Sequence, residues 1–152
     1  MPGDYGYIQK DHCIVTVYWG EVSLVDILET ISRRIRDPEL VEASASVIDL
    51  GPATWCEVSP KYVHDELTRL RPVFAPPKLP TLIVAPGDFF YGFGRMYALI
   101  QVIYGAARVE VVRSWKEAET ALGRGLEGAE AWARERASEK TGERTVRVAP
   151  LR

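Results

Sequence analysis

The stretch that decides the fold is Pro80-Thr-Leu-Ile-Val-Ala-Pro-Gly-Asp88-Phe-Phe-Tyr-Gly-Phe-Gly-Arg95-Met-Tyr-Ala-Leu-Ile-Gln-Val-Ile-Tyr104. Its first part is a short run of apolar and β-branched residues, which predicts a buried strand over residues 80–85. A Pro-Gly-Asp turn follows, and the apolar residues after it recur at helical spacing. The stretch therefore predicts a strand, a turn and a helix capped by Asp88, which is the repeating unit of an α/β fold.

Strands and helices alternate along the rest of the chain. The Cys13–Trp19 run is apolar on both faces, which is typical of a central strand, and Ser23 with Asp26 resembles a capping box. The alternation predicts the order β-β-α-β-α-β-α-β-α and a mainly parallel sheet with the first strand at an edge. The remaining elements are expected as strands over 5–9, 46–50 and 109–113, helices over 24–36, 60–75 and 115–122, and a loop over 51–59.

The composition changes after Gly123, where charged residues dominate. We expect an α/β domain over residues 1–123 and a charged appendage over 124–152. Within the appendage, residues 127–140 have a helical pattern and residues 145–148 alternate like a short extended segment. The appendage has too few apolar residues to fold alone, so it lies on its own domain, joins a partner chain, or is partly disordered.

The overall composition narrows the class of protein. A chain of 152 residues is expected to form one main domain, and a formal charge of −2 gives no reason to expect nucleic acid or an anionic membrane as a partner. No apolar run approaches about 18 residues, so no membrane span is expected. The first residues do not resemble a secretory signal, and two cysteines suggest buried thiols in a reducing compartment. A cytoplasmic location is the expectation.

Four stretches together resemble a known family. They are Gly20-Glu-Val-Ser23 with Asp37-Pro38, Val47-Ile-Asp-Leu50, Ala85-Pro-Gly-Asp88 through Tyr97, and Trp115-Lys-Glu-Ala-Glu-Thr-Ala-Leu122. In this order they resemble the STAS-like proteins, the fold of the anti-sigma-factor antagonists, and more narrowly the small bacterial SpoIIAA-like and Sec14-type proteins. The likeness spans roughly residues 5–122. It implies a STAS-like α/β fold and a regulatory or binding module instead of an enzyme.

The resemblance also implies where a regulatory switch would lie. In the antagonists, a serine in an Asp-Ser-Ser or Asp-Ser-Ala run after the third strand is phosphorylated. This chain departs from that pattern, since Thr54 and Ser59 are the only hydroxyl residues in the corresponding loop.

The residues that most often carry chemistry are sparse. The histidines and cysteines have no metal-ligand spacing, so neither a metal nor a cofactor is expected. Cys56 lies ahead of an expected helix start, where a thiolate would be stabilised, although a buried structural thiol is the more common case.

Ligands of open α/β sheets bind beyond the carboxyl ends of the strands. A site there would be built from Thr54, Ser59, Asp88, Tyr91 and Arg95, although Ser59 and Asp88 can equally be helix caps. Two functions remain open. One is a binding module for a regulatory protein or a small apolar or anionic ligand; the other is a small enzyme using Asp88, Arg95 and Tyr91.

The expected helix over 89–104 has more aromatic residues than one buried stripe can hold. We predict an inner face formed by Phe89, Phe93, Met96, Ile100 and Ile103. A second line of Phe90, Tyr97 and Tyr104 would then need cover from a neighbouring chain, the tail or a ligand. We therefore expect a homodimer, with Trp132 of the tail also at its interface. The helix glycines, Gly92 and Gly94, indicate either close packing or approach of a ligand to the backbone.

Overall fold

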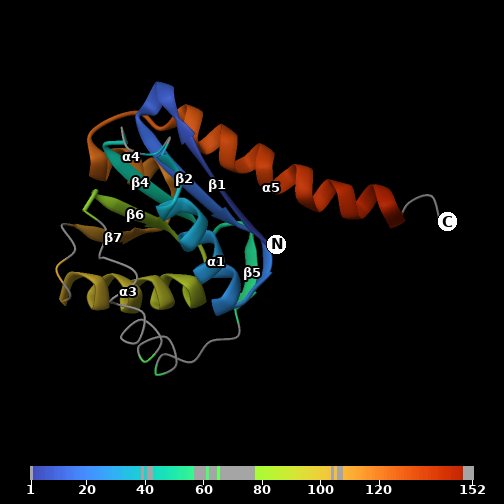
Figure 1. The fold of residues 1–152 in the computed structure, drawn as a ribbon, viewed down its shortest axis with the longest axis horizontal. Coiled ribbons are helices and arrows are strands. Elements are labelled where there is room, and N and C mark those ends of the chain that lie inside the picture. The colour runs from blue at the N-terminus through green and yellow to red at the C-terminus, as the bar shows by residue number, and fades with distance from the viewer. Residues whose placement is uncertain are drawn as a thin grey trace.

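The computed structural model describes residues 2–38, 40, 43–56, 61, 65, 78–103, 105 and 108–148. The strands and helices follow one another along the chain as the sequence predicts, with additional short elements (Figure 1). They are β1 (Gly3–Ile8), η1 (Gln9–Asp11), β2 (Cys13–Tyr18), β3 (Gly20–Val22), α1 (Leu24–Ile35), β4 (Ala45–Asp49), β5 (Ala53–Cys56), β6 (Thr81–Val84), α3 (Asp88–Ile103), β7 (Val109–Val112), α4 (Trp115–Leu122) and α5 (Glu127–Val148). The helix expected over residues 60–75 lies largely outside the described residues.

The main sheet has five strands in the order β1-β2-β4-β6-β7. Strand β1 pairs with β2 in antiparallel fashion and lies at an edge, whereas the other neighbouring pairs are parallel. This confirms the mainly parallel sheet with the first strand at its edge. All six residues of β2 are buried, which confirms that it is a central strand covered on both faces.

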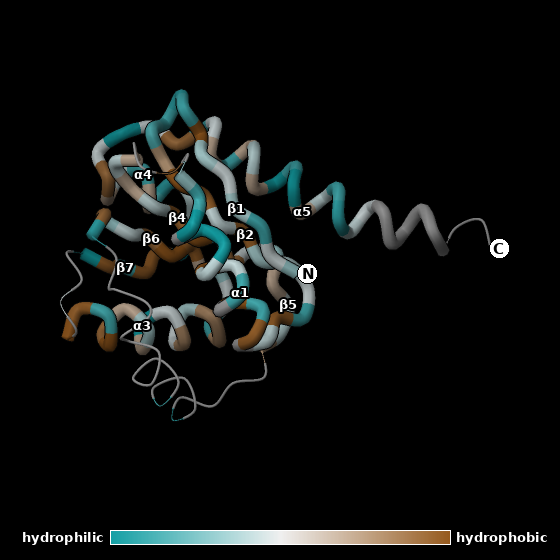
Figure 2. The backbone as a smooth tube through the Cα atoms, in the orientation of Figure 1, coloured by the Kyte–Doolittle hydropathy of each residue, from teal (hydrophilic) through white to brown (hydrophobic). Residues whose placement is uncertain are grey.

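Helices cover both faces of this sheet. On one face, Val15 and Val17 of β2 are fully buried in a cluster with α4 and α5; on the other, Tyr18 and Ile83 pack with α3 and α1. The hydropathy colours follow this arrangement, with hydrophobic strands inside and a hydrophilic outer part of α5 that projects past the sheet (Figure 2). The fold therefore has three layers, with the sheet in the middle.

The expected loop over residues 51–59 is partly wrong. Residues Ala53–Cys56 form β5, which pairs in parallel with β3 as a separate two-stranded sheet. The Thr-Trp-Cys run has the composition of a strand, but its partner is only three residues long and begins at Gly20, where the backbone has a φ of 66°. Such a short long-range pairing leaves little trace in the sequence.

The capping box predicted at the start of α1 is confirmed, and α4 has a side-chain cap as well. Ser23 and Asp26 form both hydrogen bonds of a capping box at the start of α1. The Ser114 side chain accepts a hydrogen bond from the Glu117 N–H at the start of α4. These local hydrogen bonds fix where both helices begin.

Helix α5 packs its first half against the same core as β2. Ala129 and Ala133 are fully buried there, and their small side chains let the helix approach the sheet closely. The buried Asp11 accepts a hydrogen bond from the Ala129 N–H (2.7 Å), and Asp4 of β1 pairs with Arg136 (2.6 Å). The helix continues through Val148, so the extended segment expected over residues 145–148 is wrong.

The predicted inner face of α3 is only partly correct, because Ile100 is buried as expected but both ends of the predicted face are not. Phe89 and Ile103 are 55% and 68% exposed, whereas Phe90, Gly94 and Ala98 are buried against the sheet. The physical reason is close approach, because a Cβ at Gly94 would lie only 3.2 Å from the Val111 methyl groups. The helix therefore places Gly94 and Ala98 against the sheet together with Phe90 and Ile100. This confirms the packing explanation for Gly94.

We predict that the two glycines of α3 respond in opposite ways to alanine. Gly94→Ala forces Val111 to move and should destabilise the protein by about 1–2 kcal/mol, the overpacking penalty less the gain in helix propensity. Gly92 has no neighbour within 4 Å of an added Cβ, so Gly92→Ala should stabilise by up to about 1 kcal/mol. Urea unfolding of both variants measures this, and equal effects would contradict the packing explanation.

Candidate functional site

An open hollow of about 610 Å³ lies at the carboxyl ends of β4, β6 and β7. We call it the carboxyl-end hollow. Its polar lining comes from strand ends, from the start of α4 and from α5, whose docking on the sheet closes one side. The side chains that the chemistry depends on are Asp49, Arg113, Trp115, Lys116, Glu130 and Arg134.

The only buried carboxylate of this hollow is Asp49, which is 4% exposed. Its Oδ1 accepts a hydrogen bond from the Gly51 N–H (2.8 Å), and its Oδ2 accepts one from Trp115 Nε1 (3.2 Å). Burial raises the pKa of Asp49, while the same two hydrogen bonds act in the lowering direction. Both carboxylate oxygens are thus engaged in holding the turn after β4 and the first residue of α4.

The cations of the hollow outnumber its carboxylates by three to two. Arg134 pairs with Glu130 (2.7 Å), and Arg113 pairs with Asp88 outside the hollow (2.8 Å). Lys116 is exposed and has no ionic partner among the described residues. With Asp49 satisfied by neutral donors, the arrangement favours an anion over a cation.

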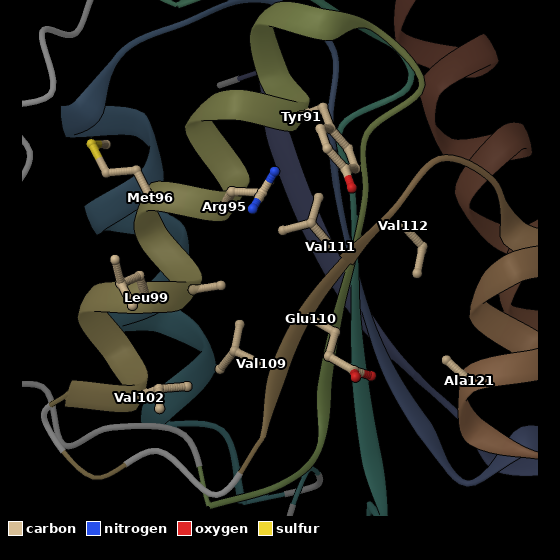
Figure 3. A pocket seen from close by; sticks show the side chains of 11 residues that line it. Tyr91, Arg95, Met96, Leu99, Val102, Val109, Glu110, Val111, Val112 and Ala121 are labelled. Carbon is tan, nitrogen blue, oxygen red and sulfur yellow. The ribbon is translucent and has the colours of Figure 1, made fainter.

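A second hollow, of about 820 Å³, lies between α3 and the outer edge of β7 (Figure 3). We call it the β7 groove. Its lining is largely apolar, with Leu99 and Val102 from α3 and Val109 and Val111 from β7. Arg95 and Glu110 are its charged residues.

The structure does not bring the five expected site residues into one pocket. Thr54 is exposed on β5, and Ser59 lies outside the described residues. Asp88 begins α3 with its side chain 97% exposed, and Arg113 bridges it to Tyr91, with the guanidinium 3.8 Å from the centre of that ring. Arg95 lines the β7 groove beside Tyr91.

Sequence reasoning missed the residues of the carboxyl-end hollow. Asp49 was visible as a polar residue at the end of a strand. The pairing with Trp115, which lies 66 positions further on, and the arrival of Glu130 and Arg134 on a docked helix had no local signal.

Three of the four expected interface residues are covered by their own chain. Phe90 is 7% exposed in the core beneath α3, and Tyr97 packs in the same cluster, where burial raises its pKa. Trp132 lies against β1, since a Cβ at Gly6 would be 2.8 Å from its ring. Tyr104 is outside the described residues. For Phe90 and Tyr97 the reason is the orientation of α3, which turns both side chains into the core.

Both cysteines are free and buried. Burial raises the pKa of the Cys56 thiol to about 11 and that of Cys13 to about 12. Neither is a thiolate at neutral pH, so Cys56 has the structural role and not the reactive one. Among the described residues there is also no group of three candidate metal ligands, and no described helix is long and apolar enough to span a bilayer.

The fold defines a class: a mixed α/β protein with a mainly parallel sheet, which is consistent with the STAS-like architecture expected from the sequence resemblance. Scans of protein-family models and of curated proteins found no significant match to the chain.

Solved structures that are similar to this chain include the following two. One is an uncharacterised protein of the DUF3478 family with a SpoIIAA-like fold from Shewanella loihica PV-4. It is 13% identical, with a TM-score of 0.49, over 78% of this chain and 89% of that chain. The other is the anti-sigma factor antagonist SpoIIAA in its unphosphorylated form. It is 11% identical, with a TM-score of 0.43, over 78% of this chain and 94% of that chain. The likeness concerns the fold alone.

We predict that Trp115→Phe destabilises the protein by about 1–3 kcal/mol at neutral pH, because one oxygen of the buried Asp49 carboxylate loses its donor. That hydrogen bond lowers the pKa of Asp49, so its loss raises the pKa further. A carboxyl group whose pKa is higher in the folded than in the unfolded protein lowers stability at pH values above the unfolded pKa. This penalty disappears at lower pH, where the group is protonated in both states. The loss should therefore shrink as the pH falls towards the ordinary Asp range, near about 4. Urea unfolding against pH measures this; a pH-independent loss would indicate packing alone.

We also predict slow reaction of Cys56 with iodoacetamide at neutral pH in the folded protein. Its thiol is 3% exposed, and a pKa of about 11 leaves almost no thiolate. Mass spectrometry of labelled peptides follows the reaction, with urea-unfolded protein as the reference. Rapid native labelling would show that the thiol is accessible and activated.

Proposed function

We propose that the chain is a non-enzymatic binding module of STAS-like fold that holds a small anionic ligand in the carboxyl-end hollow. The observation that carries this proposal is a cation without an ionic partner among the described residues, Lys116, beside a buried carboxylate whose two oxygens already accept hydrogen bonds; the other two cations are paired. Lys116 lines the hollow and is exposed, so its ammonium group is available to such a ligand.

The start of α4 adds to this potential. Helix α4 begins at Trp115, so its positive end lies at the rim of the hollow beside Lys116. An anion held there would accept from side-chain donors that come from different elements, which is how small ligands are usually fixed in α/β proteins.

The geometry supports binding better than catalysis. Burial raises the pKa of Asp49, but the residue is only 4% exposed and both of its oxygens already accept hydrogen bonds, from Gly51 and Trp115. The alternative of a small enzyme around Asp88 and Arg95 loses support, because Asp88 points to solvent while Arg95 lines a different hollow.

A regulatory role through a protein partner, a cytoplasmic location and a homodimer remain predictions that rest on the sequence. The homodimer has lost part of its basis, since Phe90 and Tyr97 are covered within the chain. The exposed apolar residues of α3 are instead Phe89, Leu99, Val102 and Ile103.

Titration with inorganic phosphate tests the anion site. The Trp115 indole N–H lies in the hollow, so its NMR resonance should shift as phosphate binds. Lys116→Ala should weaken binding about tenfold, the loss of one charge-assisted hydrogen bond. Added sodium chloride should also weaken phosphate binding to the unchanged protein, because salt screens exposed charges.

Lys140→Ala is the matched control, since Lys140 is an exposed lysine further along α5 that does not line the hollow. It should bind phosphate as the unchanged protein does. An indole resonance that does not respond to phosphate, or that responds equally in the Lys116 variant, would contradict an anion site here. Native mass spectrometry of the purified protein then identifies any anion that is retained.

A further inference from the structure

Strand β7 is the last strand of the sheet, and among the described residues no strand pairs with its outer edge. The Arg108 and Val112 carbonyls accept hydrogen bonds from the N–H groups of Thr81, which begins β6, and of Ala85, which follows it (2.9 and 2.8 Å). Because backbone groups alternate in direction along a strand, the N–H and C=O of Val109 and Val111 point outwards. The strand thus presents a short unpaired edge, which is a template for another strand.

The unpaired edge opens into the β7 groove. Apolar side chains of α3 form one wall, and two of them, Leu99 and Val102, are 63% and 49% exposed. An extended chain laid along the edge would place every second side chain against this wall, because side chains of a strand alternate between its two faces. The shape and lining therefore suit a strand with apolar residues on one face.

One cation in the groove has no carboxylate partner in the part of the chain that the structure describes. Glu110 is neutralised by Arg108, whose Nε lies 2.9 Å from the Glu110 carboxylate. Arg95 is exposed, extends from α3 into the space beside Val111 (Figure 3), and has no ionic partner among the described residues. The groove thus combines a hydrogen-bonding edge, an apolar wall and a single positive charge.

We propose that the β7 groove binds an extended segment of a partner protein as an added strand. The segment pairs with the backbone of Val109 and Val111, lays alternate apolar side chains against α3, and places an acidic side chain against Arg95. This site is separate from the carboxyl-end hollow and does not depend on the function proposed for it.

The charges favour such a segment over a second copy of the chain. Helix α3 runs antiparallel to β7, since Tyr91 lies at Arg113 and Gly94 lies at Val111. Two copies that paired their β7 strands about a two-fold axis near Val111 would bring their Arg95 side chains together at that axis. Like charges placed there repel, whereas an acidic side chain of a partner neutralises Arg95.

The probe is the acetylated and amidated peptide Val-Thr-Glu-Thr-Val-Thr-Val, titrated into the full chain. The amide resonances of Val109 and Val111 should shift, and their exchange with solvent should slow. Replacing the peptide Glu by Gln should weaken binding about tenfold, and Arg95→Gln in the protein should do the same. The two changes together should weaken binding no more than either alone, because both remove one interaction.

Two controls separate this binding from other causes. Arg134→Gln removes an exposed arginine of the carboxyl-end hollow and should leave peptide binding unchanged. Peptides N-methylated at the Thr positions or at the Val positions keep their side chains but lose alternate N–H donors. One of the two should fail to bind, because only one set of N–H groups faces β7.

The proposal is overturned if Val109 and Val111 do not respond to the peptide, or if both N-methylated peptides bind like the parent. It is also overturned if light scattering shows a dimer and the β7 amide resonances shift with protein concentration alone, since a second copy then occupies the edge. The Trp115 indole resonance reports on the other hollow, so either proposal can fail without the other.

Discussion

The central strand β2 must be buried on both faces, and the rest of the structure depends on this constraint. Cys13, Val15 and Val17 point to one side and have no exposed surface. Leaving such side chains in water would cost about 1.5–3 kcal/mol for each large one. The helix that covers them is α5, with α4 beside it. Helix α5, although it has few large apolar residues, is thus needed to complete the core.

The same docking shapes the candidate site. Asp11 of η1 accepts a hydrogen bond from the first turn of α5, and Asp4 of β1 binds Arg136 about two turns further along. These two contacts hold α5 against the N-terminal part of the chain. The turn between these contacts faces the carboxyl ends of the sheet and brings Glu130 and Arg134 to the hollow. Burial of β2 and construction of the site are consequences of one packing arrangement.

Local sequence signals predicted the strands and helices, whereas long-range contacts determined which face of α3 is buried and where α5 packs. Alternation of strands and helices and the Ser23 capping box depend on neighbours along the chain, so the order of the elements along the chain and the start of α1 were predictable, whereas the order of the strands within the sheet was not. The face of α3 was not, because Gly94 packs on Val111 for reasons of space that hydropathy does not record. Ala129 and Ala133 were likewise too weakly hydrophobic to indicate a docked helix, and with it the site.

Arg113 lies between the two hollows, and its contacts affect which cations are available to a ligand in each. Its guanidinium lines the carboxyl-end hollow, pairs with Asp88 and stacks on Tyr91, whose ring lines the β7 groove. Movement of Arg113 towards an anion would give up both contacts. Lys116, which has no such ties among the described residues, is the cation that can turn towards a ligand without disturbing the groove. The two hollows therefore adjoin where Arg113 stacks on Tyr91, whereas their proposed ligands would bind different cations, Lys116 in one and Arg95 in the other.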